Sequence, residues 1–336
     1  MKRSGIIGAG AWGTALAAVV CRAGRDAVLW AREAEVVEAV NGTHENSLFL
    51  PGVKLDERIT ATASLAEAAD ADALLLVVPS QFLRAVTSEL GAVLKDGVPV
   101  VLCAKGIERD TGALMTEVVA DTLPGQPVAV LSGPTFAAEV AGELPTAVTL
   151  AAEDDALGAR LEEALGGQRF RIYRSGDVAG AEIGGAVKNV LAIACGITEG
   201  RGFGSNGRAA LITRGLAEMI RLCLAKGGRP ETMMGLCGLG DLVLTCSSRQ
   251  SRNYSVGVAL GEGTALDDVL AGRVSVAEGV ESAGAVDGLA RTLGIEMPIV
   301  AAVNAVLSGE LSVDHAIAGL LTRPFRSEEQ VPDASP

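Results

Sequence analysis

The sequence is short of the residues on which several classes of protein depend. It has two histidines, His44 and His315, neither beside a recognisable motif, so a multi-histidine metal site is not expected. Lysine and arginine total 28 against 41 aspartate and glutamate residues, which gives a formal charge of −13. Because nucleic-acid binding needs a basic surface, this balance argues against a nucleic-acid partner. We therefore expect a protein that binds neither a metal ion nor a polynucleotide.

Paired cysteines and long apolar runs are also missing. The six cysteines form no C-x-x-C pair and stand mostly in apolar surroundings, which predicts reduced, buried thiols and a cytoplasmic location. Lys2 and Arg3 precede an apolar run, as in a secretory signal, but glycines interrupt this run at a fixed spacing and a strand pattern follows. We expect it to belong to the fold. No run reaches about 18 uninterrupted apolar residues, so no integral membrane segment is expected.

The first half of the chain alternates between two patterns. Short β-rich runs are separated by amphipathic or alanine-rich segments, and runs such as 73–78 and 98–102 are apolar without alternation, which is typical of strands covered on both faces. This order predicts a parallel, doubly wound α/β sheet. The expected strands are 5–8, 27–30, 73–78, 98–102, 128–131, 147–150 and 169–173, and helices are expected between them, for example at 14–23, 81–94 and 112–123.

From residue 177 onward the pattern is helical. Two long alanine-rich helices are expected at 178–199 and 207–226, followed by short helices at 256–260, 266–270, 283–293, 299–307 and 313–320. With 336 residues, about two domains are expected. We predict an α/β domain over 1–176, an all-helical domain over 177–326, and a disordered polar tail over 327–336.

The clearest motif is a G-x-G-x-x-G formed by Gly8, Gly10 and Gly13, with Trp12 inside it. A strand pattern precedes it and a helix pattern follows, as in a dinucleotide-binding turn. Gly8 would permit the tight turn, Gly10 the approach of a pyrophosphate, and Gly13 the close packing of helix on strand. The alternative is a purely structural turn in a glycine-rich chain.

The next strand bears on the choice of dinucleotide. It reads AVLWARE and places Arg32 where sites that prefer NAD usually carry Asp or Glu. A guanidinium there suits a ribose 2′-phosphate, which predicts that NADP is preferred and NAD is tolerated. The alternative is a solvated arginine at the start of a helix.

Three charged residues stand where the pattern predicts apolar ones. Lys105 follows a buried strand, Lys188 lies inside the apolar helix AEIGGAVKNVLAIACGI, and Asp241 is flanked by glycines and apolar residues in GLGDLVLT. Burial and a second nearby cation lower the pKa of a lysine, which suits proton transfer near neutral pH. The alternative for Lys188 is a lysine at the helix edge that extends its ammonium group to water.

Two segments suit a phosphate. Gly133 and Pro134 lead into a helix whose N-terminus could hold an anion. Ser251, Arg252 and Asn253 precede another helix and combine a guanidinium group, an amide and a helix N-terminus. A polar loop with a good helix cap remains the alternative for the second segment.

Taken together, these motifs resemble the bacterial NAD(P)-dependent glycerol-3-phosphate dehydrogenases. GAGAWGTALA, VVPS, AKGIE, SGPTFAAEV, GGAVKNVLAIACG, ALITRGLAEM, GLGDLVLTC, SRN, AEGVES and EMPI occur in the order of that family across almost the whole chain. Ala104 and Ala277 depart from residues that are common in the family. The resemblance implies an N-terminal Rossmann domain, a helical domain, an active site between them, and a homodimer. It implies interconversion of dihydroxyacetone phosphate and sn-glycerol 3-phosphate, a precursor of phospholipids.

The resemblance also implies roles for individual residues. Lys188 would be the catalytic acid/base. The substrate would contact Lys105, Gly133, Thr135, Lys188, Asp241, Ser251, Arg252 and Asn253. The dinucleotide would contact Gly8, Gly10, Trp12, Gly13, Arg32, Lys105, Ala137, Arg252, Val276 and Glu278.

Two other functions fit part of the pattern. A dehydrogenase acting on a hydroxy acid or sugar acid would share the glycine loop and the lysine on a helix, but would not need SRN after GLGDL. A non-catalytic NADPH-binding regulator could keep the loop but would have no use for Lys188 with Asp241.

Overall fold

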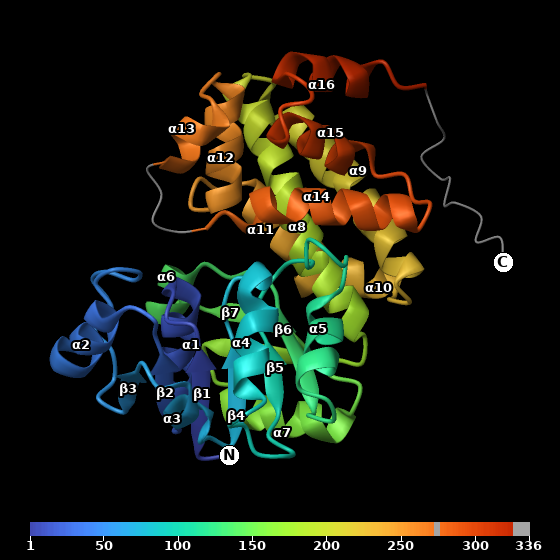
Figure 1. The fold of residues 1–336 in the computed structure, drawn as a ribbon. Coiled ribbons are helices and arrows are strands. Elements are labelled where there is room, and N and C mark those ends of the chain that lie inside the picture. The colour runs from blue at the N-terminus through green and yellow to red at the C-terminus, as the bar shows by residue number, and fades with distance from the viewer. Residues whose placement is uncertain (272–275, 325–336) are drawn as a thin grey trace.

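Figure 1 shows the computed structural model, which describes residues 1–271 and 276–324. The α/β part lies below and the helical part above in this view. The chain passes between them after β8, which ends at Ser175, and before α8, which begins at Val178. Division into two domains at residue 176 stays a prediction. The disorder expected for 327–336 concerns residues outside the described part.

Eight strands form one sheet in the order β3-β2-β1-β4-β5-β6-β7-β8. The α/β class with an all-helical second part is confirmed, but a wholly parallel sheet is wrong, because β7 runs antiparallel to β6 and parallel to β8. The short helix after β6 contacts α1 and stays at the carboxyl edge of the sheet, so the chain re-enters from that edge (Figure 1). The strands are β1 Arg3–Ile7, β2 Asp26–Trp30, β3 Ile59–Thr62, β4 Ala73–Leu76, β5 Val100–Leu102, β6 Val128–Ser132, β7 Thr146–Ala151 and β8 Phe170–Ser175.

Helices cover both faces of the sheet, as a doubly wound sheet requires. Successive residues of one strand enter different cores: Leu75 belongs to the core that contains residues of α1 and α7, whereas Leu74 and Leu76 belong to the core that contains residues of α3, α4 and α5. The pattern missed β3, α2, α3 and α7, where polar residues interrupt the apolar runs. The helices here are α1 Ala11–Arg22, α2 Ala34–Thr43, α3 Leu65–Ala69, α4 Leu83–Leu90, α5 Met115–Thr122, α6 Ala137–Ala141 and α7 Asp155–Leu165, with a 3-10 turn at Ser80–Phe82.

The helical part is built around α8, a helix of 23 residues. It is the one described helix long and apolar enough to span a membrane, yet 89% of its apolar window is buried inside the protein. It packs very closely on α12, because a Cβ added at Gly196 would lie 2.1 Å from the Tyr254 carbonyl oxygen. The helices are α8 Val178–Gly200, α9 Gly204–Ala225, α10 Pro230–Met233, α11 Asp241–Cys246, α12 Arg252–Gly261, α13 Leu266–Ala271, α14 Glu278–Thr292, α15 Pro298–Leu307 and α16 Val313–Leu321, with a π-helical turn at Leu236–Gly240.

A buried carboxylate joins the two parts. Glu182 of α8 is 6% exposed, and it accepts hydrogen bonds from the backbone N–H (2.9 Å) and the hydroxyl (2.6 Å) of Thr116, at the start of α5. Burial raises the pKa of Glu182 to about 7, against the hydrogen bonds from Thr116, which lower it. The junction therefore contains a group that changes charge near neutral pH.

Replacing this group tests its contribution to stability. Because its native pKa lies above the ordinary 4.5, the native state binds more protons between those values, and the free energy of unfolding falls as pH rises through that window. Glu182→Gln keeps an acceptor for Thr116 but does not titrate. Its free energy of unfolding, measured with denaturant, should therefore fall by on the order of 2 kcal/mol less between pH 5 and pH 8 than that of the wild type. Glu199→Gln, at a more exposed site of the same helix, is the control. Equal pH dependence in Glu182→Gln and wild type would contradict the assignment.

Candidate active site

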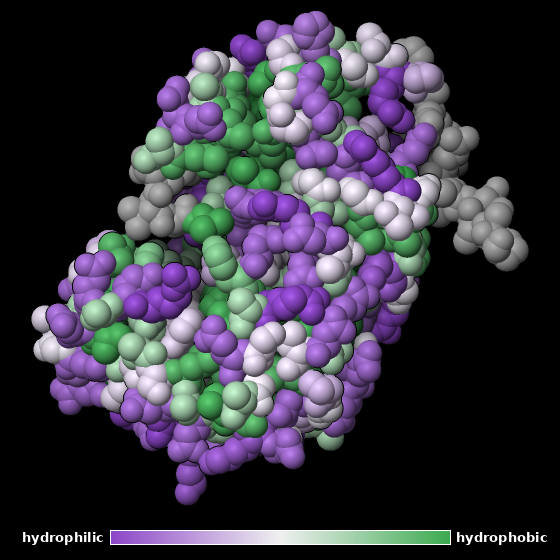
Figure 2. Space-filling model, viewed as in Figure 1, coloured by the Kyte–Doolittle hydropathy of each residue, from purple (hydrophilic) through white to green (hydrophobic). Residues whose placement is uncertain are grey.

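The carboxyl ends of the parallel strands meet at the edge of the sheet that faces the helical part (Figure 1). The glycine loop follows β1, Lys105 follows β5, and Gly133 follows β6. The space-filling view of Figure 2 shows the surface hollowed between the two parts at this level. Ligands of open α/β sheets bind at this edge, so the glycine loop, Lys105 and Gly133 stand where such ligands bind.

The glycine loop has the geometry of a dinucleotide site. Gly8 has φ +122°, and a Cβ at Gly13 would lie 1.8 Å from the Gly8 carbonyl oxygen, so the fold itself requires both glycines. A Cβ at Gly10 would meet no heavy atom within 4 Å, which leaves the loop backbone open to approach from that side. The indole N–H of Trp12 is buried and has no partner in the described part of the chain. The loop therefore fits a pyrophosphate at the N-terminus of α1.

Arg32 lies near this loop. It is exposed, two residues after β2, and the N–H of Gly8 bonds to the carbonyl of Trp30 at 3.2 Å. Among the described residues Arg32 has no ion-pair partner, so its guanidinium group is available to a ligand bound along the loop.

Asn46 supports the glycine loop by hydrogen bonds, and no sequence motif points to this residue. Its side chain is fully buried, and its Nδ2 donates to the carbonyl of Ala9 at 2.9 Å and to the hydroxyl of Thr14 at 2.8 Å. Thr14 donates in turn to the carbonyl of Gly10 at 3.0 Å. Asn46 is 32 residues from Thr14 and lies in a polar segment, so no local pattern links it to the loop.

The charged residues meet at the centre of the site. Asp241 is fully buried, and its two carboxylate oxygens take one lysine each: Lys188 Nζ lies 2.6 Å from Oδ1, and Lys105 Nζ lies 2.7 Å from Oδ2. Lys188 also donates to the hydroxyl of Thr245 at 2.9 Å, and Lys105 donates to the carbonyl of Gly133 at 3.1 Å. The side chains of Lys188 and Lys105 are 8% and 14% exposed. The centre therefore holds two ammonium groups against one carboxylate.

Burial and mutual charge set the protonation of this centre. Burial lowers the pKa of Lys188 to about 8, helped by the Lys105 ammonium group and opposed by Asp241. Burial favours protonation of Asp241, but the two lysines outweigh it and hold the pKa of this carboxyl below its ordinary value. Burial raises the pKa of the nearby Glu278 carboxyl, against Arg252 and both lysines. Lys188 is therefore poised to exchange a proton near neutral pH.

Close backbone packing brings Asp241 to Lys188. The π-helical turn Leu236–Gly240 directly precedes Asp241. A Cβ at Gly184 would lie 2.2 Å from the Cys237 carbonyl oxygen, so the turn presses on α8 one helical turn before Lys188. The sequence pattern predicted neither this turn nor α11, because glycines obscure the helical periodicity there.

The phosphate segment is tied into the fold. Ser251 caps α12 by accepting from the N–H of Tyr254 at 3.2 Å, as the alternative prediction for this segment proposed. Asn253 donates to the side-chain oxygen of Asn189 at 2.9 Å and accepts from the N–H of Gly279 at 2.9 Å. Asn253 therefore joins α8, α12 and α14, while Arg252 is exposed at the start of α12.

The remaining expected residues lie around this centre. Thr135 donates to the carbonyl of Gly133 at 3.3 Å. Ala137 begins α6 and packs on the same hydrophobic core as Trp12. Val276 is 39% exposed and precedes α14, whose first residue is Glu278. The structure therefore brings Lys105, Gly133, Lys188 and Asp241 into direct contact, and leaves Arg32 and Val276 outside this cluster.

Asn46→Asp tests the support of the loop. The aspartate keeps an acceptor for the N–H of Phe49 but removes both donors to the loop, and an unpaired buried carbonyl costs about 1–3 kcal/mol. We expect KM for NADH and NADPH to rise ~10-fold while KM for the carbonyl substrate changes less than ~2-fold. Asn41→Asp is the matched control, because the Asn41 amide pairs with the backbone of Ala61 in β3. Equal cofactor KM values in both variants would refute a role for Asn46 in the loop.

Comparisons with known proteins agree with this geometry. Residues 4–158 match the family model described as NAD-dependent glycerol-3-phosphate dehydrogenase N-terminus, and residues 177–318 match its C-terminus counterpart. The chain is 60% identical over 327 residues to glycerol-3-phosphate dehydrogenase (NAD(P)+) of Caulobacter vibrioides, covering 97% of this chain and 99% of that protein.

Solved structures give the same result. The crystal structure of glycerol-3-phosphate dehydrogenase from Coxiella burnetii matches with a TM-score of 0.93 at 41% identity, covering 96% of this chain and 99% of that one. A ternary structure of D-mandelate dehydrogenase matches with a TM-score of 0.63 at 14% identity over 94% of this chain and 99% of that one, which shows a shared fold alone. Both halves of the chain thus match one family, and the chain belongs to the NAD(P)-dependent glycerol-3-phosphate dehydrogenases.

Proposed function

We propose that this protein interconverts dihydroxyacetone phosphate and sn-glycerol 3-phosphate with a nicotinamide dinucleotide, and that Lys188 is the acid/base. The observation that carries the proposal is the buried Lys105–Asp241–Lys188 centre, at the same sheet edge as the dinucleotide loop. The family to which the chain belongs is named for this reaction.

Each member of the centre has a distinct role. Lys188 Nζ donates a proton to the oxygen on C2 as the ketone becomes an alcohol, and takes it back in the reverse reaction. Asp241 Oδ1 accepts from Nζ at 2.6 Å and fixes its direction. Lys105 partly neutralises Asp241 and adds positive charge beside the developing alkoxide. A bound reduced nicotinamide supplies the hydride.

The substrate is held by its phosphate and by the centre. The guanidinium group of Arg252 and the N-terminus of α12 suit a dianionic phosphate, with Ser251 and Asn253 fixing that end of the helix. Such anchoring places C2 at Lys188 and lowers the entropic part of the barrier. The proposed substrate contacts are Lys105, Gly133, Thr135, Lys188, Asp241, Ser251, Arg252 and Asn253.

For the dinucleotide, the glycine loop would hold the pyrophosphate and Arg32 the ribose 2′-phosphate, so we propose that NADPH is preferred and NADH is used. The proposed contacts are Gly8, Gly10, Trp12, Gly13, Arg32, Lys105, Ala137, Arg252, Val276 and Glu278. We also propose a cytoplasmic homodimer that supplies glycerol 3-phosphate for phospholipid synthesis. The six cysteines, all free and buried, agree with a reducing compartment.

Lys188→Met removes the proton donor and keeps the aliphatic stem. NADPH oxidation with dihydroxyacetone phosphate, followed at 340 nm, should show kcat reduced ~10²-fold or more, because general acid–base catalysis contributes about that factor. NADPH affinity should stay within ~2-fold, since Lys188 is not among the proposed dinucleotide contacts. Lys95→Met, at a surface ion pair with Asp70, is the control. Near-normal turnover in Lys188→Met would show that Lys188 is not the acid/base.

Arg32→Ala tests the 2′-phosphate contact. Loss of a charge-assisted contact should raise KM for NADPH by ~10-fold and leave KM for NADH within ~2-fold. Arg160→Ala, at an exposed position of α7, is the control. Unchanged NADPH affinity in Arg32→Ala would show that Arg32 does not contact the 2′-phosphate.

A further inference from the structure

The loop that carries Lys105 is held by side chains outside it. We call residues 103–113, between β5 and the bridge at Leu114, the Lys105 loop. It has no regular secondary structure apart from the bridge at Ile107, so its own backbone pairing does not fix the position of Lys105.

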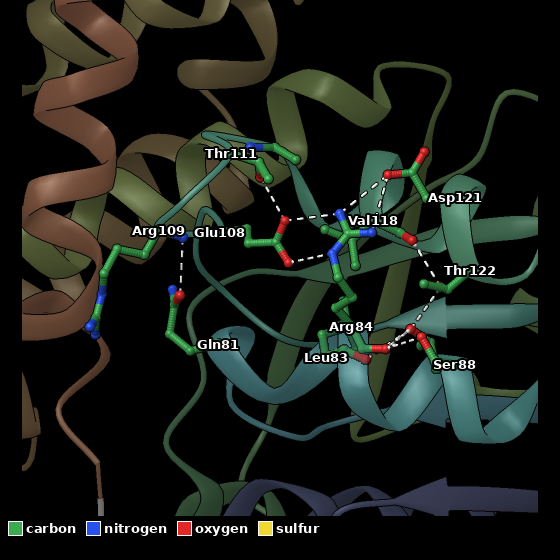
Figure 3. Close-up of polar contacts among 12 residues, drawn as sticks. Gln81, Leu83, Arg84, Ser88, Glu108, Arg109, Thr111, Val118, Asp121 and Thr122 are labelled. Carbon is green, nitrogen blue, oxygen red and sulfur yellow. Dashed lines mark hydrogen bonds and ion pairs between the residues drawn. The ribbon is translucent and has the colours of Figure 1, made fainter.

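Gln81, in the turn after β4, pairs with the backbone of this loop. Its Nε2 donates to the carbonyl of Ile107 at 2.8 Å, and its Oε1 accepts from the N–H of Arg109 at 3.0 Å. Figure 3 shows the Gln81 amide facing Arg109. One side chain therefore satisfies a carbonyl and an N–H two residues apart, as a neighbouring strand would.

Two further contacts immobilise the same stretch. Arg84 of α4 forms a two-pronged ion pair with Glu108, at 2.8 and 2.9 Å, and Thr111 donates to the same carboxylate at 2.6 Å (Figure 3). A Cβ at Gly106 would lie 2.2 Å from Ser80 Oγ, so the backbone just after Lys105 lies against the turn that carries Gln81.

The loop is also tied to the helical part. The Arg109 guanidinium group pairs with Glu281 of α14, and Asn189 of α8 donates to the Lys105 carbonyl at 3.5 Å. Gln81 thus bonds to the stretch Ile107–Arg109, which follows Lys105 and ends at the arginine that pairs with α14. A displacement of this segment would move Lys105 Nζ away from its two partners, Asp241 Oδ2 and the Gly133 carbonyl.

We propose that Gln81 is a positioning residue of the reaction: by pairing with Ile107 and Arg109 it keeps Lys105 on Asp241, and through Asp241 it sets the charge around Lys188. The inference rests on the proposed roles of Lys105 and Lys188. The ionisable groups that face Lys188 are Asp241 and Cys246 on α11, Lys105 on the loop and Glu278 on α14. Of these, Lys105 is carried by the segment that Gln81 holds, and Glu278 accepts a hydrogen bond from the backbone of Ser80, the residue before Gln81.

The proposal has a consequence that simple loss of stability lacks. The Lys105 ammonium group lowers the pKa of Lys188, so a displaced Lys105 raises that pKa. In the reduction direction Lys188 must be protonated, so the fall of kcat/KM at high pH moves to higher pH. At the same time kcat/KM near pH 7.5 falls, because Lys105 no longer stands beside the reacting oxygen. Above pH 8 the raised pKa of Lys188 increases kcat/KM, whereas the loss of Lys105 beside the reacting oxygen decreases it.

The test uses Gln81→Met, which keeps the side-chain volume and removes both hydrogen bonds. Dihydroxyacetone phosphate reduction is measured from pH 6.5 to 9.5 in wild type, Gln81→Met, Lys105→Met and the double variant. We expect kcat/KM of Gln81→Met to fall ~10-fold at pH 7.5 and its high-pH limb to move up by ~0.5 pH unit or more. Gln126→Met is the matched control, since Gln126 donates to the carbonyl of Lys95 away from this loop.

The double variant separates the possible outcomes. If Gln81 acts through Lys105, Gln81→Met adds nothing to Lys105→Met. An equal effect in both backgrounds, or an unmoved limb in Gln81→Met, would overturn the inference. Wild-type behaviour of Lys105→Met would instead overturn the proposed role of Lys105. If the Lys105 variants turn over too slowly, the titration of the Lys188 ¹³Cε resonance in lysine-labelled enzyme, assigned by its loss in Lys188→Met, gives the same comparison without catalysis.

Discussion

A single buried carboxylate between two ammonium groups organises the candidate active site. Asp241 has no exposure, and its burial is tolerated because each oxygen is paired at under 3 Å. Lys188 lies in a helix interior, Lys105 on a loop of the sheet, and Asp241 at the start of α11, so one charge cluster joins three segments. The net positive charge of this cluster is local, because acidic residues outnumber basic ones in the chain, which carries −13 overall. A doubly negative substrate is therefore attracted over a short range only, within the reach of these few cations.

Helix α8 places most of the neighbouring contacts. Along this helix, Glu182 bonds to Thr116 of α5, and Gly184 packs against the π-helical turn. Further along, Lys188 pairs with Asp241, and Asn189 bonds to Asn253. Such a helix must be apolar over most of its circumference, which is why it satisfies the length and composition of a membrane span while 89% of the window lies inside the protein. Its two buried charged residues, Glu182 and Lys188, are both paired with other segments, because an unpaired charge there would be costly.

The sequence allowed prediction of what is encoded locally. The glycine loop was predictable because three glycines stand at a fixed spacing, two of them where the fold leaves no room for a side chain, and Lys188 because a charge interrupts an apolar helix. Contacts between distant segments were not: Lys105 and Asp241 are 136 residues apart, and Asn46 reaches the loop from a segment with no pattern of its own. The direction of β7 was mispredicted for a related reason, since the path of α6 along the sheet edge depends on its packing against α1.

The π-helical turn before Asp241 also restricts which insertions and deletions this segment of the chain can accept. Such a turn accommodates one residue more than an α-helical turn, and each residue of an α-helix advances the side-chain direction by about 100°. Deleting one of the five residues from Leu236 to Gly240 would leave only enough residues for an α-helical turn, so the wider turn that packs against Gly184 of α8 could not form. Surface loops elsewhere tolerate insertions and deletions, whereas the candidate active site depends here on the number of residues in the turn as well as on their identity.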